Sequence, residues 1–254
     1  MGRLFRADTY RLMRTKGIYL TLLAIILMGI SSAVSKNVGG VDVNMNLIDT
    51  LRTGKWTLIH AMMAASLSVS VVLFLLIVVF VVTVGYEFSQ KTYKNTLTSG
   101  VSRLTFVVEK FGIMLLTIFI MMLSYFVTVL IAGSIKGYPA GGSAGKVLQT
   151  LFTNTVSDAV AVAVVFAVAT FVLALFKSII LASVMVPAWP IAISILAAET
   201  GWHWLKYVNF FVTVNDFAGG FLKWSQMAPY ISVGIGIIIV AWLLTIVTLN
   251  HQEL

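Results

Sequence analysis

The sequence contains no cysteine among its 254 residues. Disulfide bonds, thiolate metal sites and cysteine nucleophiles are therefore excluded. Histidine is almost as scarce, and His60, His203 and His251 are scattered, with neither an HExxH pattern nor a paired-carboxylate spacing in the chain. We expect no catalytic residue, no metal site and no bound cofactor, which makes an intramembrane enzyme a poor fit to this sequence.

Charged residues are the second shortage. Only 10% of the residues are charged and 59% are hydrophobic, whereas soluble domains carry roughly 25% charged residues. A soluble core of this size cannot bury so much apolar surface, so the composition predicts an integral membrane protein. The net charge of +8 does not indicate a nucleic-acid partner, because the basic residues lie beside the apolar runs and form no surface interleaved with aromatic residues.

Six apolar runs are long enough to cross a bilayer, which takes about 20 residues in a helix. The sequence therefore predicts an all-α integral membrane protein whose residues 1–254 form a single transmembrane domain. The six predicted transmembrane helices cover 17–34, 58–84, 111–135, 155–176, 179–198 and 227–249.

The predicted spans carry few polar residues. None has a charged residue at its middle, so a proton- or ion-coupled transporter lacks its usual signature. Asp158 lies about one turn inside the fourth span and is expected to be a wetted cap. Pro187 and Pro190 predict a kink or break in the fifth span. Alanine at every fourth position of the fourth span predicts close helix packing, at Ala159, Ala163 and Ala167.

The first 16 residues predict an amphipathic helix that lies in the headgroup region, since the arginines at positions 3, 6, 11 and 14 share one side of it. The alternative is an unstructured basic tail that only sets orientation. Basic residues collect on the cytoplasmic side of a membrane, and this cluster adjoins the first span. We therefore expect a multi-pass protein of the cell membrane, with both termini and segment 85–110 in the cytoplasm.

Segment 199–226 then lies outside and is rich in aromatic residues. It is too apolar for a solvated loop and too interrupted by polar residues and glycine for a span. Aromatic residues of this kind favour the lipid–water interface. We expect one or two short re-entrant helices that dip into the outer leaflet between the fifth and sixth spans and return.

Segment 85–110 is a polar interruption between the second and third spans. Residues 85–103 read G-x-E-F-x-x-x-T-x-K-N-T-L-x-x-G-x-S-R, and residues 6–17 read R-x-D-x-Y-R-L-x-R-x-K-G. With these two motifs and the six-span layout, the chain resembles the permease subunits of ABC-2 type transporters. It is most similar to the short Firmicute type that includes permeases of lantibiotic self-immunity and peptide export.

The resemblance implies that Thr92–Thr98 forms a cytoplasmic coupling helix between the second and third spans, seated in a groove of a separate ATPase subunit. The alternative is a solvated loop whose basic residues only anchor orientation. The residues that the resemblance places in the docking contact are Glu87, Lys91, Thr92, Tyr93, Lys94, Asn95, Leu97 and Arg103.

In that family a dimer of ATPase subunits, which bind ATP and magnesium, assembles with two permeases, here identical or paralogous. The resemblance implies export of an amphipathic peptide or a lipid-like substrate taken from the membrane lipid, such as an antimicrobial peptide. The alternative is a membrane sensor or assembly factor that binds a cytoplasmic partner and transports nothing. The expected pathway or gate residues are Trp189, Trp202, Trp204, Phe210, Phe211 and Phe217.

Overall fold

The computed structural model describes residues 2–36, 48, 49, 51 and 55–251, and the regular elements in these ranges are all helical. The helices of the first half are α1 (Gly2–Arg14), α2 (Lys16–Ser35), α4 (Leu58–Leu67), α5 (Val69–Phe80), the π-helical turn η1 (Val81–Gly85), α6 (Tyr86–Ser89) and α7 (Thr92–Thr98). Those of the second half are α8 (Arg103–Ile135), α9 (Ala144–Phe176), α10 (Ile179–Thr200), the 3₁₀ helix η2 (His203–Tyr207), α11 (Phe210–Ala218), the 3₁₀ helix η3 (Trp224–Gln226) and α12 (Ala228–Asn250).

Six helical stretches within the described residues are long and apolar enough to cross a membrane: Lys16–Ser35, Val69–Ser89, Arg103–Ile135, Ala144–Phe176, Ile179–Thr200 and Ala228–Asn250. The prediction of an all-α integral membrane protein with six spans is therefore confirmed. α8 and α9 have 33 residues each, or about 50 Å at 1.5 Å per residue. Both are longer than the hydrocarbon core of a bilayer, which is about 30 Å thick.

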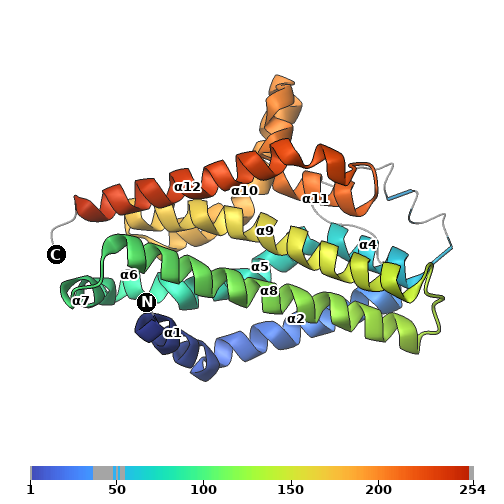
Figure 1. The fold of residues 1–254 in the computed structure, drawn as a ribbon, viewed down its shortest axis with the longest axis horizontal. Helices are drawn as coiled ribbons and strands as arrows, with labels where there is room; N and C mark the ends of the chain where they lie inside the picture. The colour runs from blue at the N-terminus through green and yellow to red at the C-terminus, as the bar shows by residue number, and fades with distance from the viewer. Residues whose placement is uncertain (1, 37–47, 50, 52–54, 252–254) are drawn as a thin grey trace.

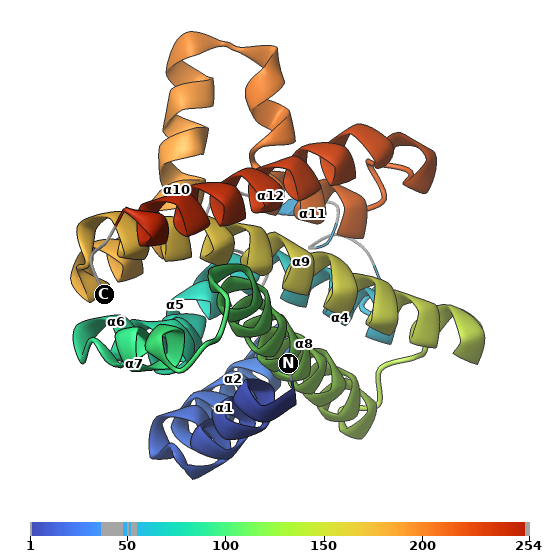
Figure 2. The same ribbon diagram turned by 60° about the vertical axis from the view of Figure 1, so that its left-hand side comes forward.

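α8 and α9 form the centre of the bundle. α8 packs against α2 and α9, and α9 also packs against α10 and α12, as Figure 2 shows. α1, α7 and the end of α12 lie together at one end of the bundle, which we call the α7 end (Figure 1). α11 and the α8–α9 connection lie at the other, which we call the α11 end. The predicted alanine stripe on α9 is buried at all three positions, Ala159, Ala163 and Ala167.

The second span departs from its prediction as one continuous helix over 58–84. It is broken at Ser68, between α4 and α5, and its last turn is the π-helical turn η1. At the break the Ser68 hydroxyl donates to the Ala64 carbonyl at 3.5 Å. The Tyr125 hydroxyl of α8 donates to the Ala65 carbonyl at 3.2 Å. Hydrogen bonds from side-chain hydroxyls to helix carbonyls often bend a helix. Here they also give the Ala64 and Ala65 carbonyls hydrogen-bond donors at the interrupted turn.

α10 contains Pro187 and Pro190 in its interior. Its first half lies along the bundle, and its second half stands away from it (Figures 1 and 2). A proline removes one helical hydrogen bond and its ring displaces the preceding turn, so a bend is expected there. The predicted kink is therefore confirmed, although the helix continues through both prolines.

The α8–α9 connection depends on Gly141, which has φ +79°. A Cβ at this position would lie 2.7 Å from the Thr57 Cβ, and Thr57 caps α4 by accepting a hydrogen bond from the His60 backbone N–H at 3.2 Å.

We expect Gly141→Ala to destabilise the protein by about 1–3 kcal/mol through backbone strain and this overlap. The measurement is the midpoint of thermal unfolding of the detergent-purified protein. Gly145→Ala is the control, because a Cβ there meets nothing within 4 Å, and equal shifts for both variants would contradict the prediction.

Candidate functional site

The segment between the second and third spans folds as a short helix at the α7 end. α7 covers Thr92–Thr98, the bounds expected for the coupling helix. It begins after Lys91, whose backbone is left-handed at φ +55°, and the turn that follows it contains Gly100 at φ +93°. α8 then starts where the Ser102 hydroxyl accepts a hydrogen bond from the Thr105 backbone N–H at 3.1 Å. The chain between α6 and α8 therefore consists of α7 with one turn before it and one turn after it.

The eight predicted docking residues fall into two groups, one buried within the chain and one exposed or half-buried at its surface. Tyr93 and Leu97 on α7 and Glu87 on α6 are buried within the chain. Tyr93 stacks on Phe88 with ring centroids 4.6 Å apart, and burial raises the pKa of its hydroxyl above the ordinary value. The side chains that face outward are Lys91, Thr92 and Asn95, with Lys94 and Arg103 half-buried. The apolar face of α7 thus holds the helix on its own chain, and a partner would meet the polar face.

A cluster of four charged side chains, which we call the ion cluster, lies beneath this segment. It consists of Asp8 and Arg11 on α1, Glu87 on α6 and Lys110 on α8. The Lys110 Nζ donates to both Asp8 carboxylate oxygens, at 2.8 and 2.7 Å, and it also pairs with Glu87. The Arg11 guanidinium donates to Glu87 Oε1 at 2.7 Å and lies 3.2 Å from Asp8. Two acids and two bases therefore alternate in one closed network.

Three of the four side chains of the ion cluster are shielded from water, since Lys110 is only 1% exposed and Asp8 and Glu87 are also buried, whereas the Arg11 side chain is 34% exposed. Arg11 additionally donates to the backbone carbonyl of Thr83 at 2.9 Å, and Thr83 lies in the π-helical turn η1. Buried charges are stable only when they are paired and hydrogen-bonded. The ion cluster therefore ties α1, the end of the second span and the start of α8 into one unit that carries α7.

The sequence prediction missed the ion cluster because its members are far apart in the chain: Asp8 and Lys110 are separated by 102 residues. A partial signal was present. Asp8 is the single acid in a basic segment, and Asp8 and Arg11 are three residues apart, which places them on one face of a helix. The amphipathic helix predicted in the first 16 residues is present as α1, and its position in the headgroup region stays a prediction.

Asp158 occupies a different environment from the predicted one. Its carboxylate is fully buried, and its two oxygens accept from the Ser66 hydroxyl at 3.2 and 3.0 Å. The prediction of a wetted cap was wrong because α9 begins at Ala144, eleven residues before the predicted start of the fourth span. Asp158 is therefore almost four turns inside its helix, next to the break in the second span.

The predicted pathway residues lie on α10, at η2 and on α11. Trp202 and Trp204 stack on each other with ring centroids 6.0 Å apart, and both are more than half exposed. Phe210 and Phe211 are buried at the start of α11, and Phe217 is half-buried near its end. Trp189 is partly buried within α10, and its indole nitrogen has no hydrogen-bond partner among the described residues. The structure thus distributes these side chains over α10, the following turn and α11.

No group of three or more histidine, aspartate or glutamate side chains within the described residues is placed to hold a metal ion. A family model described as ABC-2 family transporter protein matches residues 4–188. The matched range contains most of α1, the ion cluster, α7 and the first proline of α10, and it ends before α11. No curated protein gives a significant match to this chain.

Proposed function

We propose, on the premise that this chain belongs to the ABC-2 family of transporter proteins, that it couples ATP hydrolysis in a separate ATPase subunit to the export of a substrate. Membership makes the chain a membrane subunit of an ABC transporter, a permease that works with an ABC ATPase. The finer proposal is that ATP binding and hydrolysis in that ATPase move α7, and that α7 moves the spans. ATP and magnesium would be bound by the partner.

One observation carries the proposal: α7 packs on its own chain through Tyr93 and Leu97, and the ion cluster ties the adjoining α6 to α1 and α8. A docking element transmits force only if it is fixed to the parts that must move. α7 follows α6, and Glu87 of α6 is paired with Arg11 of α1 and Lys110 of α8. A displacement of α7 would therefore reach two spans and the N-terminal helix together.

The polar face of α7 defines the proposed contact. Its outward side chains are Lys91, Thr92 and Asn95, and Lys94 and Arg103 add positive charge beside them. Such a surface fits an acidic groove on the partner, because complementary charges steer and orient association. We propose that the α7 end faces the cytoplasm, in agreement with the basic residues of α1, which would then lie on the inner side of the membrane.

The docking test is a double variant, Lys91→Glu with Asn95→Glu, which reverses one charge and introduces a second negative charge. If the partner groove is acidic, these changes place like charges across the contact and should weaken association about tenfold or more, since 1.4 kcal/mol is a factor of ten. The measurement is the amount of ATPase that copurifies with the tagged permease. Lys136→Glu is the matched control, because Lys136 is an exposed lysine at the other end of α8. An undiminished complex with the double variant would refute docking through this face.

The substrate proposal is an amphipathic molecule, such as an antimicrobial peptide, and the biological role would be self-immunity or resistance. Its support is the sequence resemblance and the aromatic segment at the α11 end, which would lie outside. We propose a complex of two ATPases and two permeases, identical or paralogous.

A catalytically dead ATPase should abolish protection of the cell against the peptide. Full protection with the dead ATPase would favour the alternative of a sensor or assembly factor that transports nothing.

A further inference from the structure

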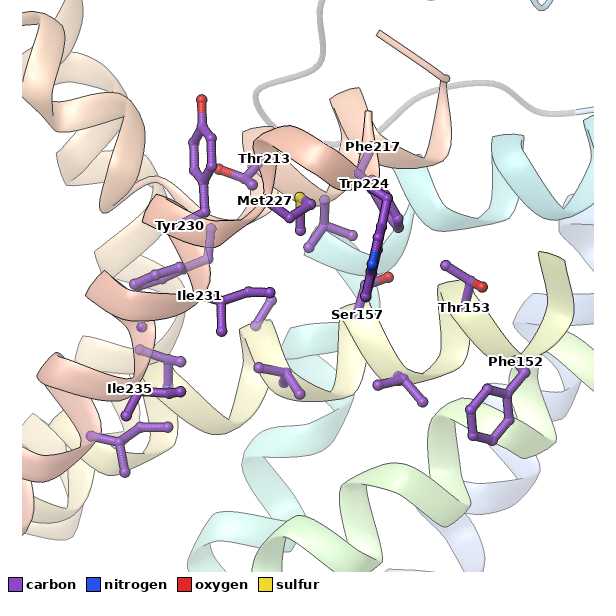
Figure 3. A pocket seen from close by; sticks show the side chains of 18 residues that line it. Phe152, Thr153, Ser157, Thr213, Phe217, Trp224, Met227, Tyr230, Ile231 and Ile235 are labelled. Atoms are coloured by element: carbon purple, nitrogen blue, oxygen red, sulfur yellow. The ribbon is translucent and has the colours of Figure 1, made fainter. Parts of the chain in front are cut away.

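A cavity of about 310 Å³ lies between α9 and α12 at the α11 end of the bundle. Figure 3 shows side chains from α9, α11, η3 and α12 gathered around it. α9 and α12 form its two long walls, and α11 closes it on the inner side through Phe210 and Val214, which are buried against Ala161 and Val164. We call this cavity the α9–α12 groove. None of its lining residues belongs to α7 or the ion cluster.

The lining of the α9–α12 groove is almost entirely hydrocarbon. Apart from aromatic and aliphatic side chains it presents hydroxyls, and two of these are already committed to the backbone. Ser157 donates to the Asn154 carbonyl at 3.1 Å, and Thr213 donates to the Asn209 carbonyl at 3.0 Å. The remaining polar groups in the lining are the hydroxyls of Thr153 and Tyr230 and the indole of Trp224, too few to satisfy a peptide backbone or a sugar along the length of the groove. Its occupant is therefore expected to be mainly apolar over the buried length.

The groove has the length of one leaflet. Its α9 wall extends from Phe152 to Val164 and its α12 wall from Met227 to Ile238. At 1.5 Å per residue these walls are about 18 and 17 Å long, and half of a hydrocarbon core is about 15 Å. The groove runs along two helices that are both long and apolar enough to span the membrane. It therefore lies parallel to the chains of the surrounding lipid.

The groove opens to the surface of the spans. Val160, Ile231 and Ile235 line it and are each 44–52% exposed, and this is a surface that meets lipid in a membrane. At the end beside η3, Trp224 and Phe217 lie against each other with ring centroids 5.7 Å apart. Tyr207 and Tyr230 form a second pair at 4.9 Å. Aromatic side chains of this type collect at the level of the headgroups, so the groove begins at the interface and extends inward.

We propose that the α9–α12 groove binds one acyl chain of a phospholipid from the leaflet at the α11 end. The bound acyl chain fills the part of the space between α9 and α12 that α11 leaves empty. It also holds α11 against α9 and α12. The site is separate from the α7 contact and does not depend on the proposed coupling to an ATPase. It rests on the position of the groove within the spans.

The test uses the full chain in vesicles of phosphatidylethanolamine and phosphatidylglycerol that contain a phosphatidylglycerol with a photoreactive diazirine in its acyl chain. After illumination, labelled peptides are identified by mass spectrometry. We expect labelling at residues 152–164 and 227–238 to exceed labelling at the exposed apolar face of α2, which carries Leu20, Leu23 and Leu27. Equal labelling of the groove and of α2 would show ordinary lipid contact and would overturn the proposal.

A filling variant makes the test specific. Gly234 lines the groove, and a Cβ there would meet Val164 and Phe210 at 3.6 and 3.7 Å, which is ordinary contact. Gly234→Leu should therefore fold, fill the groove and reduce its labelling to the level of α2. Gly236→Leu is the matched control on the same helix, because a Cβ at Gly236 meets nothing within 4 Å, and its labelling should equal that of the wild type. Unchanged labelling of Gly234→Leu, or crosslinking of the groove to a second protein chain in place of lipid, would refute the proposal.

Discussion

Replacing Lys110 with methionine is expected to destabilise the protein by about 3–5 kcal/mol, the cost of removing one partner from a buried ion pair. Methionine keeps an unbranched apolar side chain that ends one atom short of the lysine Nζ, so the loss comes mainly from the charge. The two Asp8 bonds at 2.8 and 2.7 Å would disappear, and two buried carboxylates would share the single guanidinium of Arg11. The measurement is the midpoint of thermal unfolding of the purified protein, followed by size-exclusion fluorescence.

Two further variants identify the ion cluster as the cause. Lys136→Met removes an exposed lysine from the other end of the same helix and should leave the midpoint unchanged. Asp8→Asn combined with Lys110→Met removes one charge of each sign and leaves the Arg11–Glu87 pair, so it should recover part of the loss. A Lys110→Met protein as stable as the wild type would mean that the ion cluster does not hold α1 and α6 to α8.

The second large effect is expected at Tyr125, one of the largest fully buried side chains in the described part of the chain. Tyr125→Ala leaves a ring-sized cavity between α8 and the broken second span, and such truncations cost about 3–5 kcal/mol. Tyr125→Phe keeps the ring and removes the hydroxyl, which donates to the Ala65 carbonyl at 3.2 Å, and this loss should cost about 1 kcal/mol. The measurement is again the midpoint of thermal unfolding.

Ile120→Ala provides the control for Tyr125, because Ile120 lies on the same helix and is half exposed. Its truncation should shift the midpoint only slightly. If Tyr125→Phe were as damaging as Tyr125→Ala, the hydrogen bond at the helix break would be the dominant contribution and the packing argument would fail. If both were neutral, the interface between α8 and the second span would be looser than the contacts indicate.

Much of the fold was predictable because long apolar runs leave few choices in a bilayer. The bounds of α7 agree with the coupling helix that the resemblance to ABC-2 permeases implied at Thr92–Thr98. The early start of α9 was missed because residues 144–154 are too polar for a span. A readable signal did precede them: Ser143 caps the helix by accepting from the Lys146 backbone N–H at 3.3 Å, and serine is a favoured residue at that position.

The break at Ser68 and the ion cluster could not be predicted from local sequence. The apolar pattern continues across Ser68, and the break depends in part on the hydroxyl of Tyr125, 60 residues away from the carbonyl it contacts. Lys110 and Glu87 both looked like surface residues of a cytoplasmic loop, because nothing in their own neighbourhood shows that α1 covers them. Burial of this kind is decided by tertiary contacts. From the sequence alone, Lys110 and Glu87 were therefore expected at the surface, although both are buried.

The π-helical turn at Val81–Gly85 makes the ion cluster sensitive to insertions and deletions in the second span. Relative to an α-helix, a π turn contains one additional residue, and one residue corresponds to a rotation of about 100° around the helix axis. If that residue were deleted, the segment after it would turn by this angle and Glu87 would point away from Arg11 and Lys110. The chain can therefore tolerate substitutions along the second span more readily than a change in its length before Glu87.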